Sequence, residues 1–245
     1  QLLLLKKNDH TIIFISHKIR EVMQICDNIT VLRAGRTVGS IPVANATEED
    51  ISRFMVGRDV ILKMNKKPAE FGDTLLKVTD LTYENKEGRK LLDHVSFSLK
   101  KGQILGIAGV EGNGQNELAE AIFGFYSGVK GSILFDGKEI LGKSIRAIRD
   151  DGISYIPEDR IKTGAAGNIS LWGNMIADII DSPLLKKHGL LNYKNIHERA
   201  DKLISDFGVL CQNDDQPIGM LSGGNMQKVV VAREFSSDPK LLIAN

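Results

Sequence analysis

The sequence predicts an α/β fold, because short apolar runs typical of strands alternate with segments that have helical periodicity. The clearest example is the apolar run 104–110, which leads through a glycine-rich turn into a helical segment. Further strand-like runs occur at 153–156 and 241–244. Alternation of this kind favours a mainly parallel sheet, with ligand sites where the strands end.

Residues 1–63 are expected to form a separate part that precedes this sheet. The run Ile12–Ile15 is β-branched and aromatic, which predicts a buried strand, and His17 lies at its C-terminal end. Thr47 and Asp50 have the spacing of a capping box and predict the start of a short helix. A helix and a hairpin are expected between these features, at 19–26 and 29–39.

The segment 64–73 has the composition of a linker, with two lysines followed by a proline and a glycine close to its end. We therefore expect a domain boundary there and assign residues 74–245 to a second part. Alternating apolar residues at 75–78 and 95–99 predict antiparallel strands at the beginning of this part. Helical segments are expected at 115–125, 196–207 and 223–235.

The charge balance is close to neutral, with 32 Lys or Arg, 31 Asp or Glu and a formal net charge of +1. Such a chain has no bulk field that favours nucleic acid or anionic lipid, so a nucleic-acid partner is not expected. Its longest apolar runs are far shorter than the roughly 20 residues of a membrane-spanning helix. The 2 cysteines form no metal-binding or disulfide framework, which favours a reducing, cytoplasmic compartment.

The turn after the run 104–110 has the glycine spacing of a phosphate-binding loop between a strand and a helix. Glycines in such loops let backbone N–H groups approach phosphate closely at a helix N-terminus. The lysine and the hydroxyl residue that complete the motif are replaced by Gln115 and Asn116. A tight structural turn is the alternative that the loop alone leaves open. The residues of the loop are Gly109, Val110, Glu111, Gly112, Asn113, Gly114, Gln115 and Asn116.

A second glycine-rich motif begins at Leu221 and has the sequence Leu-Ser-Gly-Gly-Asn-Met-Gln. It resembles the signature motif of the ATP-binding cassettes of ABC transporters, and it follows the phosphate loop in the order of that family. Ser222 and the amides of Gly223 and Gly224, at a helix N-terminus, suit a γ-phosphate. A serine N-cap followed by flexible glycines is the structural alternative. The resemblance implies a P-loop NTPase-like fold with an antiparallel β subdomain and a helical subdomain that carries the signature motif.

Two further positions depart from the pattern of this family. The segment Tyr155–Arg160 resembles the Q-loop region, with Glu158 in place of the usual glutamine. Asn245 follows the run 241–244 and takes the place of the aspartate that ends the Walker B strand. Together with the changes in the phosphate loop, these departures predict a degenerate cassette that binds ATP with weak or absent magnesium. No residue is assigned as a metal ligand.

Residues 1–63 resemble the end of another cassette, because the expected strand is followed by His17 and a helix, as in the H-loop of the family. A single histidine at a strand end is more often structural, and the family order favours a catalytic role for His17. The segment 54–58 also resembles the link between the cassettes of tandem sugar and nucleoside import ATPases. The chain would then be a fragment with the end of cassette one and most of cassette two, ending at the Walker B strand.

The resemblance also implies how these residues would act. In tandem proteins of this family, two cassettes close head to tail, and each nucleotide lies between the phosphate loop of one cassette and the signature of the other. His17 and Ser222 would serve one hydrolytic site as catalytic residues, whereas the loop at 109–116 would belong to the other site. The implied partners are membrane permeases and, through them, an extracytoplasmic substrate-binding protein. The chain would act at the cytoplasmic face of the cell membrane.

Several alternatives remain at this point. Nucleosides are the favoured cargo, because the signature asparagine and the degenerate loop look most like nucleoside importers, and simple sugars of the ribose or galactose type are the alternative. A non-transport cassette ATPase would need basic arms for nucleic acid, which the near-neutral charge does not offer. For the chain alone, a non-catalytic nucleotide-binding module is a third hypothesis. Tyr83 and Trp172 are expected to pack rather than to stack on adenine, and His197 has no spacing typical of a metal site.

Overall fold

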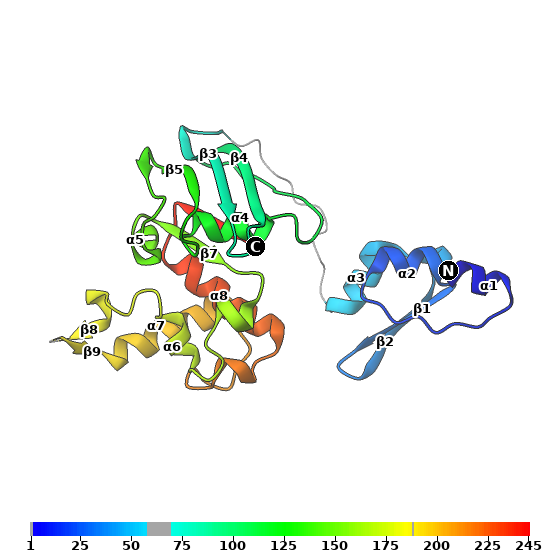
Figure 1. Ribbon diagram of the computed structural model, residues 1–245. Coiled ribbons are helices and arrows are strands. Elements are labelled where there is room, and N and C mark those ends of the chain that lie inside the picture. The colour runs from blue at the N-terminus through cyan, green and yellow to red at the C-terminus, as the bar shows by residue number, and fades with distance from the viewer. Residues whose placement is uncertain (1, 58–69, 188) are drawn as a thin grey trace. The chain divides into compact units, whose positions relative to one another are not determined.

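The computed structural model of the chain describes residues 2–57, 70–187 and 189–245 (Figure 1). It divides into two compact units, Gln1–Pro68 and Ala69–Asn245. Most of the predicted linker at 64–73 lies outside the described residues. The assignment of 1–63 and 74–245 to two different cassettes stays a prediction.

The first unit combines short helices with an antiparallel hairpin. Thr47 and Asp50 form the expected capping box, in which the Asp50 backbone N–H donates to Thr47 Oγ1 at 3.1 Å and the Thr47 N–H donates to Asp50 Oδ2 at 3.2 Å. A small core of Ile29, Val31 and Ile51 holds the unit together. Its elements are α1 (Leu2–Lys7), α2 (Ile19–Ile25), β1 (Asn28–Arg33), β2 (Arg36–Pro42) and α3 (Glu48–Val56).

The strand predicted at Ile12–Ile15 is absent from the structure, which has no regular secondary structure at these residues. Ile13 and Ile15 are each 91% exposed, so the run is not buried either. An apolar, β-branched run becomes a strand only where a neighbouring strand completes its backbone hydrogen bonds. In the described part of the first unit, β1 pairs with β2 and neither pairs with this run. The prediction of a buried strand before His17 was therefore wrong.

The second unit begins with the predicted antiparallel strands, which form a sheet in the order β4-β3-β5-β6. A turn at residues 85–89 connects β3 and β4. Leu81 and Ile133 are fully buried on this sheet, and Phe123, just after the helix α4, packs in the same core. The strands are β3 (Thr74–Glu84), β4 (Lys90–Lys100), β5 (Lys130–Phe135) and β6 (Lys138–Glu139).

The parallel part of the second unit consists of β7 (Ile153–Ile156) and β10 (Leu241–Ala244), paired in register from Ile153 and Leu241 onward. The helices α4 (Gln115–Ile122) and α5 (Ile145–Asp150) belong to the same core region. The strand predicted at 104–110 is wrong, because this run has no regular secondary structure, with Ile104 80% and Val110 75% exposed. Within the described residues, no strand pairs with it, so its backbone lacks the neighbour that a parallel ladder requires.

The rest of the second unit is helical and packs around its own core of Leu171, Met175, Ala200, Ile218 and Val229. The helix α8 contacts α6 and α7 on one side and β7 on another (Figure 1). None of the helices in the described part of the chain combines the length and the apolar character needed to cross a membrane. The elements are α6 (Leu171–Met175), β8 (Lys186–Lys187), β9 (Leu190–Leu191), α7 (Tyr193–Asp206) and α8 (Gly223–Ser236). An antiparallel β part, a parallel pair and this helical part confirm the α/β class.

Candidate functional site

The loop at 109–116 follows the coil at 104–108 and leads into the first turn of α4. Gly112 has φ +83° and Gly114, the N-cap of α4, has φ +98°, a left-handed backbone that L side chains rarely adopt. A Cβ on Gly114 would also lie 2.7 Å from the backbone oxygen of Leu91. These glycines are therefore needed for the shape of the turn, and phosphate binding by this loop stays a prediction.

The side chain of Gln115 folds back into the loop. Its Nε2 donates to the backbone oxygen of Val110 at 3.2 Å. A Cβ on Gly109 would lie only 2.2 Å from the same Nε2, so the amide is packed against the first glycine of the motif. Gln115 thus occupies the interior of the loop with a neutral amide, where the family motif has a lysine.

Asn116 connects the loop to the segment after β7. Its Nδ2 donates to Glu158 Oε2 at 2.6 Å, although the two residues are 42 positions apart in the chain. The sequence analysis singled out both residues, and the structure brings them together. Asn245 is hydrogen-bonded to the end of β7, two residues before Glu158. Its N–H donates to the Ile156 oxygen at 2.9 Å, where the parallel pair ends.

The pocket at this loop is lined with carboxylates. It has a volume of about 350 Å³, and its lining contains three glutamates but no lysine or arginine. Carboxylates repel phosphate, and the loop offers neither the lysine nor the hydroxyl with which such loops hold phosphate and magnesium. The donor set therefore suits a Mg-nucleotide poorly. The lining residues are Gly109, Glu111, Gly112, Gln115, Asn116, Glu117 and Glu158.

The signature loop has different surroundings. Ser222 is the N-cap of α8, and its Oγ accepts from the Asn225 N–H at 3.5 Å and from Asn225 Nδ2 at 3.1 Å. Asn225 is fixed in turn, because its Oδ1 accepts from the Leu210 N–H at 3.0 Å. Ser222, Gly223 and Gly224 are exposed to solvent. As first residues of a helix, the two glycines have N–H groups without an intrahelical acceptor, so they can donate to an anion.

The helix α8 is anchored by a buried charged residue, Glu234, that the sequence analysis did not single out. The Glu234 carboxylate is fully buried and accepts two hydrogen bonds from Arg149, both at 3.0 Å. It also accepts from Arg233 Nε at 2.8 Å and from the Tyr155 N–H at 3.2 Å. These bonds tie α8 to α5 and β7. No signal in the sequence indicated this pairing, because Arg149 and Glu234 are 85 positions apart.

The remaining predicted residues lie elsewhere. His17 is exposed in the first unit, whereas Ser222 belongs to the second. The hypothesis that both residues act in one hydrolytic site stays a prediction. Tyr83 stacks on Tyr126, with ring centroids 4.4 Å apart, and Trp172 packs edge-on against His197 at 5.8 Å. Both aromatic residues have packing partners, as the sequence analysis expected.

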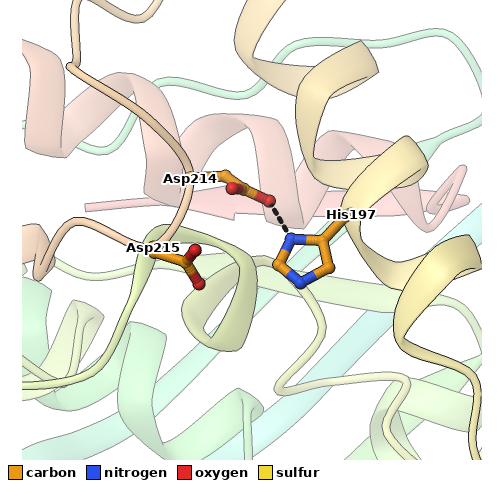
Figure 2. A group of neighbouring side chains, drawn as sticks. All are labelled: His197, Asp214 and Asp215. Carbon is orange, nitrogen blue, oxygen red and sulfur yellow. Dashed lines mark hydrogen bonds and ion pairs between the residues drawn. The ribbon is translucent and has the colours of Figure 1, made fainter.

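His197, Asp214 and Asp215 form a cluster that the sequence spacing did not indicate (Figure 2). His197 Nδ1 lies 2.5 Å from Asp214 Oδ2, and this hydrogen bond raises the pKa of the histidine. Asp215 accepts instead from Trp172 Nε1 at 3.0 Å. Two ligands of one tetrahedral zinc ion would lie roughly 3.3 Å apart, given metal–ligand distances of about 2.0 Å. The shorter separation indicates a direct hydrogen bond between His197 and Asp214.

The helical part that presents Leu-Ser-Gly-Gly at the start of α8, together with the antiparallel sheet and the glycine loop before α4, defines an ATP-binding cassette. The chain belongs to the ABC transporter family, whose profile matches residues 92–245. A nucleotide-free ATP-binding cassette from an ABC transporter is 26% identical and aligns with a TM-score of 0.56 over 70% of this chain and 68% of its own. A cassette dimer in a post-hydrolysis state with ADP and Pi shares the fold, with a TM-score of 0.58 over 69% of this chain and 73% of its own at 20% identity.

Curated relatives match nearly the whole chain. The glucose import ATP-binding protein TsgD13 of Haloferax volcanii is 36% identical over 96% of this chain and 43% of its own length. The nucleoside import ATP-binding protein NupA of Lactococcus lactis is 33% identical over 98% and 47%. The ribose import ATP-binding protein RbsA of Clostridium tetani is 37% identical over 98% and 46%. The chain thus spans about half the length of these relatives.

Proposed function

We propose that this chain is part of the ATP-hydrolysing subunit of an ABC importer and contributes its signature motif to a composite nucleotide site. The observation that carries the proposal is the exposed cradle of Ser222, Gly223 and Gly224 at the start of the firmly anchored α8. The names of the relatives, which are import ATP-binding proteins for glucose, nucleosides and ribose, support the same role.

In this role, Ser222 acts through its hydroxyl proton. The Ser222 oxygen accepts from Asn225, so its proton is free to be donated to a phosphate oxygen. The N–H groups of Gly223 and Gly224 add two donors at the positive end of α8. These donors stabilise the charge that develops on the transferred phosphoryl group. His17 contacts the same phosphate and the attacking water in this proposal, and a phosphate loop other than 109–116 holds the nucleotide.

The loop at 109–116 has a non-catalytic role in this proposal. Its neutral Gln115, its Asn116–Glu158 hydrogen bond and its acidic lining favour weak ATP binding with little or no magnesium. Asn245, in the Walker B position, has no carboxylate with which to hold magnesium. For the chain alone, these features favour a second candidate function, a non-catalytic nucleotide-binding module.

The cargo that we propose is a nucleoside, with simple sugars as the alternative. Relatives named for nucleoside, ribose and glucose import are similarly distant from this chain, at 33%, 37% and 36% identity. The partners are membrane permeases, reached at the cytoplasmic face of the membrane, and indirectly an extracytoplasmic substrate-binding protein. In this proposal, the cassettes close when ATP binds, and this closure moves the attached permeases.

The test is ATP turnover by the complete subunit assembled with its permeases. Ser222→Ala should lower the rate of phosphate release by about a hundredfold, because loss of one charge-stabilising donor costs on that order. Ser205→Ala, at an exposed serine of α7, is the matched control and should leave the rate unchanged. An unchanged rate in Ser222→Ala would contradict the proposed function.

A further inference from the structure

Arg160 lies against the signature loop. A Cβ on Gly223 would be 2.7 Å from Arg160 Nη2 and 3.3 Å from its Cζ, so the guanidinium packs on the first glycine of α8. Arg160 begins a five-residue π-helical turn, Arg160–Gly164, that follows Glu158 and Asp159. A cationic side chain from the Q-loop-like segment is therefore placed beside the proposed phosphate cradle.

The acidic residues next to Arg160 do not bond to its guanidinium, although the charge of Arg160 helps to lower the pKa of Asp159. Glu158 accepts from Asn116, and Asp159 Oδ1 accepts from the backbone N–H groups of Ile161 and Lys162, both at 3.0 Å. Within the described residues, Arg160 has no hydrogen bond or ion pair, and its buried Nε atom lacks a partner. A buried N–H of a charged group without an acceptor is costly.

The position of Arg160 is also unfavourable for a cation. The N-terminus of α8 carries a positive partial charge, and an arginine placed there is repelled in the absence of an anion. An anion that bridges the Nη groups of the guanidinium and the helix N-terminus removes this repulsion, because it accepts from N–H groups of each. The contact of Nη2 with Gly223 and the unfavourable position for a cation both point to an anionic ligand.

Both sides of this cradle are held on one framework. Arg233 of α8 donates from Nη2 to the Gly164 oxygen at 2.9 Å, which ties the end of the π-helical turn to the signature helix. Thr163 Oγ1 donates to the Asp159 oxygen at 2.6 Å and closes the beginning of the turn. The guanidinium and the loop at 222–224 are thus positioned together before any ligand binds.

We propose that Arg160 is a phosphate-binding residue of the signature cradle. Its guanidinium, the Ser222 hydroxyl and the N–H groups of Gly223 and Gly224 together bind the terminal phosphate of a nucleotide held by a second cassette. This inference rests on the proposed function and adds a charged donor to it. A planar guanidinium offers two parallel N–H donors to one phosphate, which a lysine ammonium cannot reproduce.

The first test measures ATP turnover by the complete subunit assembled with its permeases. Arg160→Gln should lower kcat/KM for ATP by about a hundredfold, in the range found for arginines and donors on a transferring phosphoryl group. Arg160→Lys keeps the charge but not the two parallel N–H donors, so its kcat/KM should lie between those of Arg160→Gln and the wild type. Lys162→Gln is the matched control, since Lys162 is exposed, carries the same charge and is two residues away.

The outcomes separate the two proposals. If Ser222→Ala abolishes turnover and Arg160→Gln does not, the proposed function stands and the role of Arg160 is overturned. If neither variant changes turnover, the proposed function itself fails. Equal losses in Arg160→Gln and Lys162→Gln would indicate a general effect of charge and would also overturn the assignment.

The second test uses inorganic phosphate and the 245-residue chain, with calorimetry as the readout. Arg160→Gln should weaken phosphate binding by about tenfold relative to the wild type and to Lys162→Gln, because one charge-assisted pair is lost. Unchanged phosphate affinity in Arg160→Gln would overturn the proposal. If phosphate affinity falls while turnover is unchanged, the ligand is free phosphate, and the assignment to the nucleotide is overturned.

Discussion

The loops at 109–116 and 222–224 both lead into a helix of the second unit, α4 and α8, and both offer backbone N–H groups at its first turn. Around the first loop lie three glutamates and the folded-back Gln115. Beside the second loop lies the guanidinium of Arg160, and its own residues are exposed. Most residues of the first loop are exposed as well, so the two loops share a backbone arrangement and differ in the charge of their surroundings.

This difference shows that glycine spacing determines only the shape of such a loop. A helix N-terminus attracts an anion by a modest amount, typically 0.3–1 kcal/mol at an exposed site, about the same as one or two nearby charges contribute. Three carboxylates close to a loop outweigh that attraction, whereas one unpaired arginine adds to it. We therefore expect the side chains around the glycines to decide which loop binds phosphate.

The largest expected effect comes from the anchor of α8, on which the second loop depends. Glu234→Ala leaves Arg149 and Arg233 without their buried partner, so we expect a loss of roughly 3–5 kcal/mol in the free energy of unfolding. Urea unfolding of the chain measures it. The control is Glu198→Ala on α7, whose exposed carboxylate has only a surface partner, with an expected change within about 0.5 kcal/mol. Equal stability of the two variants would contradict the anchoring role.

The next effect concerns the first loop and its missing side chains. The double change Gln115→Lys and Asn116→Ser restores the residues that hold phosphate and magnesium and removes the bond to Glu158. We expect the affinity for ATP with magnesium to rise by about tenfold, which corresponds to one charge-assisted contact. Titration with a fluorescent nucleotide, with and without magnesium, measures this gain. If the wild-type chain already binds Mg-ATP as tightly as the double variant, the loop is not degenerate.

Local signals in the sequence were sufficient for the elements that depend on neighbours in the chain. The capping box at Thr47 and the start of α8 at Ser222 are examples, since their hydrogen bonds join residues three positions apart. The runs at 12–15 and 104–110 were misjudged, because apolar character does not reveal whether a neighbouring strand exists. Without a neighbouring strand these runs are unpaired and largely exposed, although their apolar character predicted buried strands.

Contacts between distant residues were also beyond the sequence. Both partners of the Asn116–Glu158 bond were singled out as departures from the family pattern, but their contact could not be derived from spacing. Arg160 was part of a recognised segment and carried no signal of its own, because its position beside Gly223 depends on the packing of two separate elements. Charged residues that meet only in the folded chain give no periodic pattern.

A smaller effect is expected from the bond that closes the first loop. Asn116→Ala removes the hydrogen bond to Glu158, and we expect a loss of about 0.5–1 kcal/mol, since both side chains are close to solvent. Amide hydrogen exchange should become faster in the segment that follows β7. Asn195→Ala, which removes an exposed side chain-to-backbone bond in the helical part, serves as the comparison. Unchanged exchange after β7 would show that the bond does not hold this segment.

The smallest effect concerns the helical part that precedes the signature loop. The hydrogen bond to Asp214 raises the pKa of His197 above its ordinary value of 6.5. The resulting stabilisation is fully present below the unfolded pKa and is lost as the pH rises through the folded pKa. The histidine is partly exposed, so the effect should stay below about 1 kcal/mol. His197→Gln should be less stable than the wild type at pH 5.5 and equally stable at alkaline pH, as measured by thermal unfolding.

Asp214→Asn offers an independent check of the same pair. It should remove the same pH-dependent part of the stability, because the charged partner of His197 is lost. A pH-dependent difference that persists in Asp214→Asn would assign the titration to another group.

The most direct test of the difference between the two loops is a titration of the isotope-labelled chain with inorganic phosphate, followed by amide chemical shifts. We expect the amides of Gly223 and Gly224 to shift with phosphate concentration, because their N–H groups point into an exposed cradle beside Arg160. The amides of Gly112 and Gly114 should stay in place, because their loop is lined with glutamates that repel phosphate. Shifts at Gly112 and Gly114 with none at Gly223 and Gly224 would contradict this assignment.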